Sequence, residues 1–314
     1  MLPKVVAFGG GHGLSASLRA LRRVTDHLTA IVTVADDGGS SGRLRGEFDI
    51  LPPGDLRMAL AALCADDEEG MTWADVLQAR FRGNGPLAGH AIGNLLIAGL
   101  WQQLGDEVAA LDMVGRLLGV RGRVLPMSSV PLEIEADVIG LDPFAPEELN
   151  TLTGQATVAS AKAEVKAVRI VPAEPQARPE ALEAIRDADA VVLGPGSWFT
   201  SVIPHLLVPE LSQALIDTKA QRVLVLNVEP ADETSGFSAS RHIELLREHA
   251  PAVRFDVVIA DDGFVAHDSE IRAAAAAIGA ELIVDDLAAR DGTATHDINR
   301  LATAFTKVIG RGKD

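Results

Sequence analysis

The sequence predicts an α/β fold, a Rossmann-like parallel sheet with helices on both faces and an inserted antiparallel β arm. Two observations predict the sheet. Short apolar segments alternate with longer helical patterns, and these segments are almost uniformly apolar, as strands are when helices cover both faces of a sheet. A third observation predicts the arm, because one stretch alternates apolar and polar residues as half-exposed strands do.

The strands expected in the sheet are short apolar runs. They cover residues 4–8, 30–35, 190–194, 222–228, 255–260 and 281–284. Between them the spacing of leucines and alanines predicts helices over 15–24, 55–64, 89–104 and 273–280. Asp55 follows Pro-Pro-Gly and is the expected N-cap of the second helix. We expect one domain over residues 1–314, with the arm inserted at 124–172.

The composition excludes several classes of function. Lys and Arg number 28 against 44 Asp and Glu, which gives a formal charge of −16. Such a surface repels nucleic acid and anionic lipid. Cys64 is the single cysteine and tyrosine is absent, which excludes a multi-cysteine metal site and a tyrosine acid or base. No apolar run nears the roughly 18–20 residues of a membrane span, so we expect a soluble cytoplasmic protein without membrane insertion.

The first motif is a glycine loop between a strand and a helix, "FGGGHGLSASLRAL" at 8–21. Glycines let the backbone approach a phosphate, and the start of the helix offers free N–H groups. The candidate ligand residues are therefore Gly10, Gly11, His12 and Gly13. The spacing matches neither the GxGxxG fingerprint nor the Walker A loop. A tight β–α turn without a ligand is the alternative.

The second motif, "VTVADDGGSSGRLR" at 32–45, follows the next strand. Asp36 and Asp37 would lie beside the first loop in a doubly wound sheet, where ligands bind. Either carboxylate could hold a ribose hydroxyl or a divalent cation, and Arg43 could clamp a diphosphate with two hydrogen bonds. Ser40 and Ser41 would add hydroxyl groups. The alternative is that these side chains only cap a helix and hydrogen-bond a turn.

The third motif is "GHAIGN" at 89–94. His90 and Asn94 are four residues apart, which would place them on one face of a helix. A histidine and an amide do not make a metal site. Ligand binding and plain satisfaction by backbone groups are equally compatible with this pair, since buried polar groups need partners.

The fourth motif, "LGPGSWFTSVIPHLLVPEL" at 193–211, repeats the arrangement of the first in the other half of the chain. A strand ends at a glycine loop that is followed by hydroxyl side chains. Two such loops at strand ends can face one crevice. Asn227, which ends the next strand, and residues 229–238 could extend its rim. The candidate residues are Gly194, Gly196, Ser197, Thr200, Ser201 and Asn227.

Taken together, these motifs resemble the YvcK/CofD-like family, and more closely its YvcK branch of gluconeogenesis factors. The resemblance covers roughly residues 1–260. It rests on the order of "GGGHGLSASLRAL", "IVTVADDGGSSGRLR", "LPPGDLRMAL", "GHAIGNLLIAGL", "RGRVLP", "VLGPGSWFTSVIPHLLV" and "LNVEP…ETSGFS".

The resemblance implies a nucleotide in the crevice of a Rossmann-like fold. Gly10, Gly11 and Gly13 would face its phosphates, and the second glycine loop would close the crevice from the far half. The central wall would be lined by Asp36, Asp37, Ser40, Ser41, Arg43 and Arg57. The sequence departs from the family at His12, where a small hydroxyl residue is commoner, and at Trp198-Phe199, where Leu-Tyr is more usual.

The resemblance also implies a function. Members of the YvcK branch are associated with UDP-sugar binding, gluconeogenic growth, cell shape and cell-wall synthesis, so we expect a nucleotide-sugar-binding regulatory protein. The alternative is a transferase acting on a nucleotide-diphosphate donor, as the 2-phospholactate transferases of the CofD branch do. An NAD-dependent dehydrogenase is a third interpretation, which the incomplete fingerprint and the missing tyrosine disfavour.

The expected partners follow from that function. The ligand would be a UDP-sugar or another dinucleotide, and no cofactor would be required. Mg²⁺ on Asp36 and Asp37 belongs to the transferase alternative. A cell-wall-synthesis protein would be the regulated partner, and the β arm could join two copies of the chain into a homodimer, although the arm could equally cover the site.

Overall fold

The sheet of this computed structural model is parallel throughout and contains seven strands within residues 2–309, the part of the chain that the structure describes. Its order is β10-β9-β8-β7-β1-β2-β3. The strands are β1 (Val5–Gly9), β2 (Leu28–Val32), β3 (Arg123–Pro126), β7 (Ala190–Leu193), β8 (Gln221–Val225), β9 (Val257–Asp261) and β10 (Glu281–Asp285). The predicted fold class is confirmed.

The centre of the sheet is held by large apolar side chains in register. Phe8 of β1 pairs with Ile31 of β2 on one side and with Leu193 of β7 on the other. All three are buried, and burial of each such side chain contributes about 1.5–3 kcal/mol. The chain runs outward from β1 to β3 and then returns to β7 on the opposite side of β1. The point between β1 and β7 is therefore a topological switch point, where open α/β sheets bind ligands.

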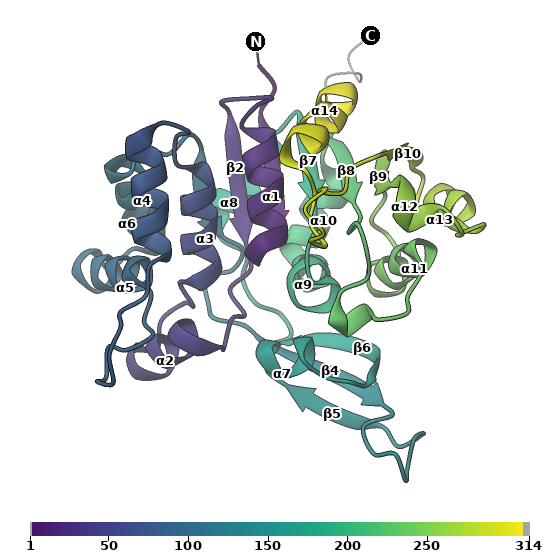
Figure 1. The fold of residues 1–314 in the computed structure, drawn as a ribbon, viewed down its shortest axis with the longest axis horizontal. Helices are drawn as coiled ribbons and strands as arrows, with labels where there is room; N and C mark the ends of the chain where they lie inside the picture. Colours follow the sequence, from purple (N-terminus) through teal and green to yellow (C-terminus); the bar gives the residue numbers. More distant parts are fainter. Residues whose placement is uncertain (1, 310–314) are drawn as a thin grey trace.

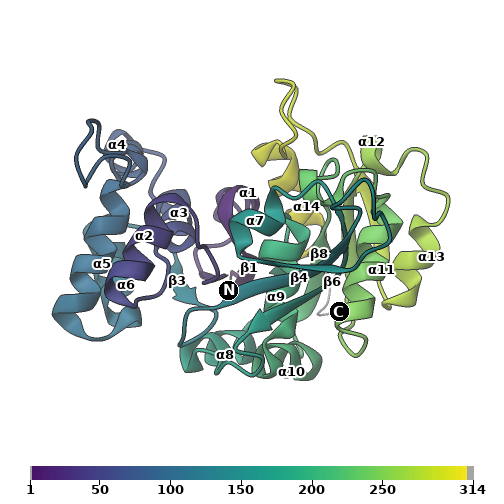
Figure 2. The same ribbon diagram turned by 90° about the horizontal axis from the view of Figure 1, so that it is seen from below.

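Helices cover both faces of the sheet, as predicted. Figure 2 shows α1, α3 and α14 on one side and α8 and α10 on the other. The helices are α1 (Gly11–Leu21), α2 (Gly39–Phe48), α3 (Gly54–Leu63), α4 (Glu68–Gln78), α5 (Ile92–Leu104), α6 (Glu107–Leu117), α7 (Gln155–Ala159), α8 (Pro179–Arg186), α9 (Ile203–Leu207), α10 (Pro209–Asp217), α11 (Ala239–His249), α12 (Asp262–Val265), α13 (Ile271–Ala277) and α14 (Ile298–Val308).

Helix α1 shows why the sequence forms these layers. Leu14, Leu18 and Leu21 recur at helical spacing, and all three are buried. On its outer side α1 packs against α14, whose Leu301 and Phe305 are also buried. The last helix of residues 2–309 thus covers the first (Figure 1). No helix within residues 2–309 is both long and apolar enough to cross a membrane.

The arm is a separate antiparallel sheet of order β5-β4-β6. It consists of β4 (Glu133–Ile139), β5 (Asn150–Thr153) and β6 (Glu164–Val171), with α7 between β5 and β6. Burial alternates along β4, as the polar pattern predicts. The arm is shorter than the predicted 124–172, because β3 pairs in parallel with β2 in the main sheet. Figure 1 shows the arm below the carboxyl ends of the central strands.

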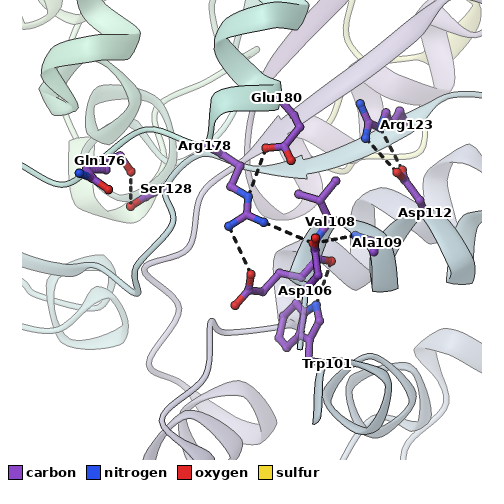
Figure 3. A network of polar contacts seen from close by, with 11 residues as sticks. Trp101, Asp106, Val108, Ala109, Asp112, Arg123, Ser128, Gln176, Arg178 and Glu180 are labelled. Atoms are coloured by element: carbon purple, nitrogen blue, oxygen red, sulfur yellow. Dashed lines mark hydrogen bonds and ion pairs between the residues drawn. The ribbon is translucent and has the colours of Figure 1, made fainter. Parts of the chain in front are cut away.

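Ion pairs join the start of α6 to the start of α8 (Figure 3). Arg178, just before α8, pairs with Asp106 at 3.4 Å and with Glu180 at 3.3 Å. Asp106 also caps α6, since its Oδ1 accepts the backbone N–H groups of Val108 and Ala109. One carboxylate therefore both caps α6 and ties it to the residue before α8.

Candidate functional site

A cavity of about 410 Å³ lies at the switch point between β1 and β7. The glycine loops that follow these two strands form opposite walls, so the structure brings the two predicted loops to one crevice. The predicted residues that line it are Gly10, Gly11, His12, Gly13, Gly196, Ser197, Thr200, Ser201 and Asn227. Glu229, Pro230 and Ala231 extend the rim, as expected for the segment after Asn227. Gly194 lies outside the lining.

The two loops touch, and glycine at position 13 allows it. A Cβ atom on Gly13 would lie 2.3 Å from the carbonyl oxygen of Pro195 and 2.5 Å from the Cα of Gly196. A Cβ on Gly10 would lie 2.4 Å from Oδ2 of Asp55. No real side chain tolerates such distances without a shift of its neighbours. These glycines thus permit close packing of the walls, in addition to leaving room for a ligand.

The first loop presents backbone N–H groups to the cavity. Helix α1 begins at Gly11, its N-cap is Gly10, and neither a side-chain cap nor an acidic residue occupies its first turn. The first N–H groups of a helix have no partner within it, and they carry the positive end of the helix dipole. Because residues 10–13 line the cavity, this end of α1 faces it and suits an anionic group.

The second loop is held in place by side chains from neighbouring strands and helices. Asn227 fixes Gly196 twice, since its Oδ1 accepts the Gly196 N–H at 2.9 Å and its Nδ2 donates to the Gly196 carbonyl at 3.1 Å. Ser17 of α1 donates to the carbonyl of Gly194 at 2.9 Å. The π-helical turn η1 (Trp198–Val202) follows and places the hydroxyls of Thr200 and Ser201 at the cavity wall.

Asp55 is a lining residue that the sequence reasoning assigned to another role. Helix α3 begins at Gly54, so Asp55 lies in its first turn and does not cap it. Its Oδ2 is inaccessible and has no hydrogen-bond partner. Burial raises the pKa of Asp55 to about 7, helped by the charge of Asp36 and opposed by the Gly11 N–H and Arg57. The carboxyl is therefore partly protonated at neutral pH.

His296 is a second lining residue that the sequence reasoning missed. It lies with Ala294 and Thr295 in the segment before α14, beyond the part of the chain that the family motifs cover. Its Nε2 is buried without a partner. Burial lowers the pKa of His296 to about 4, against the opposing effects of Asp261 and the backbone of Leu226. A neutral imidazole thus faces the cavity. No motif marked this residue, because a lone histidine in a polar loop carries no pattern.

The two carboxylates of the second motif are engaged with nearby backbone. Oδ1 of Asp37 accepts the N–H of Ala156 at the start of α7, at 2.9 Å. Oδ1 of Asp36 accepts the N–H of Gly38 at 3.0 Å. Neither residue lines the cavity. Asp37 instead ties the arm to the central loop, and α7 lines the cavity through Gln155, Ala156 and Ala159. The arm therefore covers part of this cavity.

Ser40, Ser41, His90 and Asn94 form a buried polar cluster away from the cavity. The Ser40 hydroxyl bonds Nδ1 of His90 and Nδ2 of Asn94, both at 3.0 Å, and Ser41 accepts from Asn94 at 3.4 Å. His90 precedes α5, so the prediction that it shares a helix face with Asn94 is wrong. The two residues meet through Ser40 instead. Oδ1 of Asn94 is buried without a partner.

The arginines of this region also bind backbone carbonyls. Arg43 donates to Pro86 and Ala88, at 3.3 and 3.0 Å. Arg45 donates to Leu132 at 2.7 Å. Arg57 is buried beside Asp55, and none of the three lines the cavity. As the structure stands, an anion in the cavity would meet backbone N–H groups and no guanidinium.

One group of three acidic side chains within residues 2–309 has metal-like spacing, namely Asp261, Asp262 and Asp286. Both carboxylate oxygens of Asp261 accept backbone N–H groups. Oδ1 accepts those of Gly263 and Phe264, and Oδ2 accepts those of Leu287 and Ala288. Asp286 pairs with Arg290 and Arg300. This cluster is explained by helix capping and loop anchoring. Asp36 and Asp37 belong to no such group in the described chain.

Comparison with known proteins gives consistent matches. The family described as "2-phospho-L-lactate transferase CofD" matches residues 5–303. A Mycobacterium tuberculosis protein named "Putative gluconeogenesis factor" is 53% identical over 99% of this chain and 92% of its own length. The Bacillus subtilis "Gluconeogenesis factor" is 39% identical over 82% of this chain and 78% of its own. A crystal structure of a UPF0052-family protein from Bacillus halodurans aligns with a TM-score of 0.83 and 35% identity, covering 97% and 98% of the two chains.

The fold and the cavity define a Rossmann-like protein with a crevice between two glycine loops. The matches also show its family, because both the family model and the Mycobacterium tuberculosis relative cover nearly the whole chain. The chain belongs to the YvcK/CofD-like family.

Proposed function

We propose that this protein is a nucleotide-sugar-binding regulator, with a UDP-sugar as its ligand. The observation that carries the proposal is the cavity between the two glycine loops, which the backbone at the start of α1 lines. The names of the relatives associate the family with gluconeogenesis. The regulated processes would be gluconeogenic growth, cell shape and cell-wall synthesis, through a cytoplasmic partner protein.

The lining suits a diphosphate joined to polar rings. Backbone N–H groups at a helix start favour phosphate oxygens. The hydroxyls of Ser197, Thr200 and Ser201 on the opposite wall offer donors and acceptors to sugar or ribose hydroxyls. His296 and Asp55 also line the cavity, and each adds a polar side chain that can act on a bound ligand. The volume also lies within the range of small-molecule sites.

A transferase on a nucleotide-diphosphate donor is the second candidate. It is favoured by the unpartnered Oδ2 of Asp55 and by the nearby charge of Asp36, and by the activity named in the family description. Two carboxyl groups of this kind fit a hard cation such as Mg²⁺. Asp36 and Asp55 would hold the ion, which would neutralise charge on a departing diphosphate. Asp37 does not fit that role as placed, since it binds the arm.

Calorimetry with UDP-N-acetylglucosamine tests the first proposal, and we expect saturable binding of one ligand per chain. The absence of binding by any UDP-sugar would overturn it. Mass spectrometry of the same mixtures with Mg²⁺ separates the two candidates, because a regulator leaves the nucleotide sugar intact. The variant Asp36→Asn sharpens the result. A transferase would lose turnover with little loss of binding, and a regulator has no turnover to lose.

A further inference from the structure

A second cavity, of about 700 Å³, lies between the arm and the support of the second glycine loop. Its walls come from the end of β4, residues 146–147, residues 160–164 after α7, and residues 232–237 around the 3₁₀ turn η2 (Asp232–Thr234). No residue lines both cavities, although Ala159 and Ala231 of the first are followed directly by Ser160 and Asp232 of the second.

The walls of the second cavity are acidic and partly apolar. Glu147, Glu164, Asp232 and Glu233 contribute carboxyl groups, against the single ammonium of Lys162. Glu164 is paired with Lys166 outside the cavity, at 2.6 Å. The excess of carboxyl groups favours a cation, and apolar side chains such as Ile139 and Phe237 favour an aliphatic body behind it.

Glu233 gives this cavity a feature that an acidic surface alone lacks. The residue is 5% exposed. Its Oε1 accepts the N–H of Phe199 at 2.9 Å, and the Trp198 N–H and the Thr200 hydroxyl also act on the carboxyl, but its Oε2 is buried and has no hydrogen bond of normal geometry. A buried carboxyl oxygen without a donor is costly, and native structures seldom leave one. A ligand that donates to Glu233 would remove that cost.

We propose that the second cavity binds an ammonium or guanidinium group carried on an aliphatic chain, and that Glu233 couples its occupancy to the second glycine loop. The site itself rests on the cavity, its charge and the unpartnered oxygen. The coupling to nucleotide binding rests in addition on the function proposed above.

Two connections carry the coupling. Glu233 supports η1, whose Thr200 and Ser201 line the first cavity. The segment 155–164 contributes to both cavities, and Gln155 Nε2 donates to the carbonyl of Thr200 at 3.4 Å. Ligands in either cavity therefore act on the same short turn.

The sign of the coupling follows from the chemistry of Glu233. Burial raises the pKa of Glu233 to about 7, opposed by Phe199, Trp198 and Thr200, so at neutral pH the carboxyl is partly protonated. A cation beside it favours the charged form, which is the stronger acceptor for the Phe199 N–H. The cation should therefore order η1 and strengthen nucleotide binding, and the nucleotide should strengthen cation binding by the same factor.

Calorimetric titration of the full chain tests the site. The two probes are agmatine and a blocked Gly-Arg-Gly peptide, and no nucleotide is present. We expect saturable binding of at least one probe at millimolar concentrations. Binding of agmatine alone identifies a free organic cation as the source, and binding of the peptide alone identifies an arginine of a partner protein. Absence of saturable binding by both probes would overturn the site.

Variants locate the binding. Glu233→Gln should weaken it about tenfold, because one charge-assisted contact is lost. Glu148→Gln is the matched control, since Glu148 is exposed nearby and lines neither cavity; it should bind as the wild type does. If Glu233→Gln misfolds, the exposed pair Glu147→Gln and Asp232→Asn provides the same test and should weaken binding severalfold. Unchanged binding in the paired variant and in a folded Glu233→Gln would refute the assignment.

The coupling is measured separately. With agmatine saturating, the affinity for UDP-N-acetylglucosamine should rise about threefold or more, within the usual range of coupling between sites. An unchanged affinity would overturn the coupling and leave the second site standing. If the wild type binds no nucleotide sugar at all, the proposed function and the coupling both fail, and the agmatine titration still decides the second site.

Discussion

The glycine loops and the stretch from Asp36 to Arg45 follow adjacent strands of one sheet, yet their polar groups meet different partners. The glycine loops direct backbone N–H groups and hydroxyls into the cavity. The stretch from Asp36 to Arg45, rich in carboxylates and guanidinium groups, binds the chain itself. Of the two regions, the one with fewer charged side chains forms the cavity.

The difference teaches how polar side chains are used in a folded chain. Arginine side chains donate to nearby backbone carbonyls, and aspartate side chains accept nearby backbone N–H groups. These backbone groups would otherwise need other partners. The backbone N–H groups at the start of α1 cannot be satisfied inside the helix. They stay available to a ligand where no side chain takes them, and only that of Gly11 is engaged, by Asp55. The predictions below test whether this division between the two regions holds.

The largest effect is expected for Gly13→Ala. The new methyl group would meet the backbone of Pro195 and Gly196, which cannot rotate away, so the loops must separate. We expect the free energy of unfolding to fall by about 3 kcal/mol and nucleotide-sugar binding to be lost. Urea denaturation and calorimetry measure both.

Gly46→Ala is the control for that variant. Gly46 lies in α2, and a Cβ there would meet no atom within 4 Å. Alanine also favours helix by about 1 kcal/mol over glycine, so stability should stay the same or rise. A Gly13→Ala protein that unfolds and binds like Gly46→Ala would contradict the close contact between the loops.

A smaller effect is expected from Asp55, and it depends on pH. The pKa of this carboxyl is about 7 in the folded protein against 3.8 for the unperturbed group, so the folded state holds the proton more tightly. The stabilisation that this tighter proton binding provides is complete below about pH 4 and is lost as the pH rises through about 7. Asp55→Asn has no carboxyl to ionise, so at pH 8 its free energy of unfolding should exceed that of the wild type.

Denaturation from pH 5 to pH 8 checks this, with Asp142→Asn as the control. Asp142 is exposed on the arm, so its variant should follow the wild type. Glu233, whose pKa is also raised to about 7, should leave part of the pH dependence in Asp55→Asn. Identical pH dependence of wild type and Asp55→Asn would show that the Asp55 carboxyl is charged throughout.

The smallest effect is expected for Arg43→Ala. Arg43 bonds two carbonyls at an exposed loop, so its removal should cost about 1 kcal/mol or less. Nucleotide-sugar affinity should change less than about twofold, within 0.4 kcal/mol. A tenfold loss of affinity would show that Arg43 contacts the ligand, and the two regions would then not differ as described.

Sequence patterns predicted the architecture well and the arrangement of side chains less well. The apolar strands, the two glycine loops and their position at one switch point follow from local composition and the rules of parallel sheets. His90 and Asn94 were expected to meet on a helix, yet the helix starts after His90 and the contact runs through Ser40. Asp55 was assigned a cap because Pro-Pro-Gly-Asp is a helix-start pattern. Its role depends on the approach of Gly10, which no local pattern reveals.

The sequence by itself determined the fold class, the alternation of strands and helices, and the two loops that must lie at the carboxyl edge of the sheet. These depend on apolar periodicity and on glycine, which act over a few residues. Only the tertiary structure decided which polar groups face the cavity. Asp55, His296 and Asn227 come together from segments far apart in the chain. A side chain's partners are set by burial and distance, and both exist only once the sheet has brought those segments together.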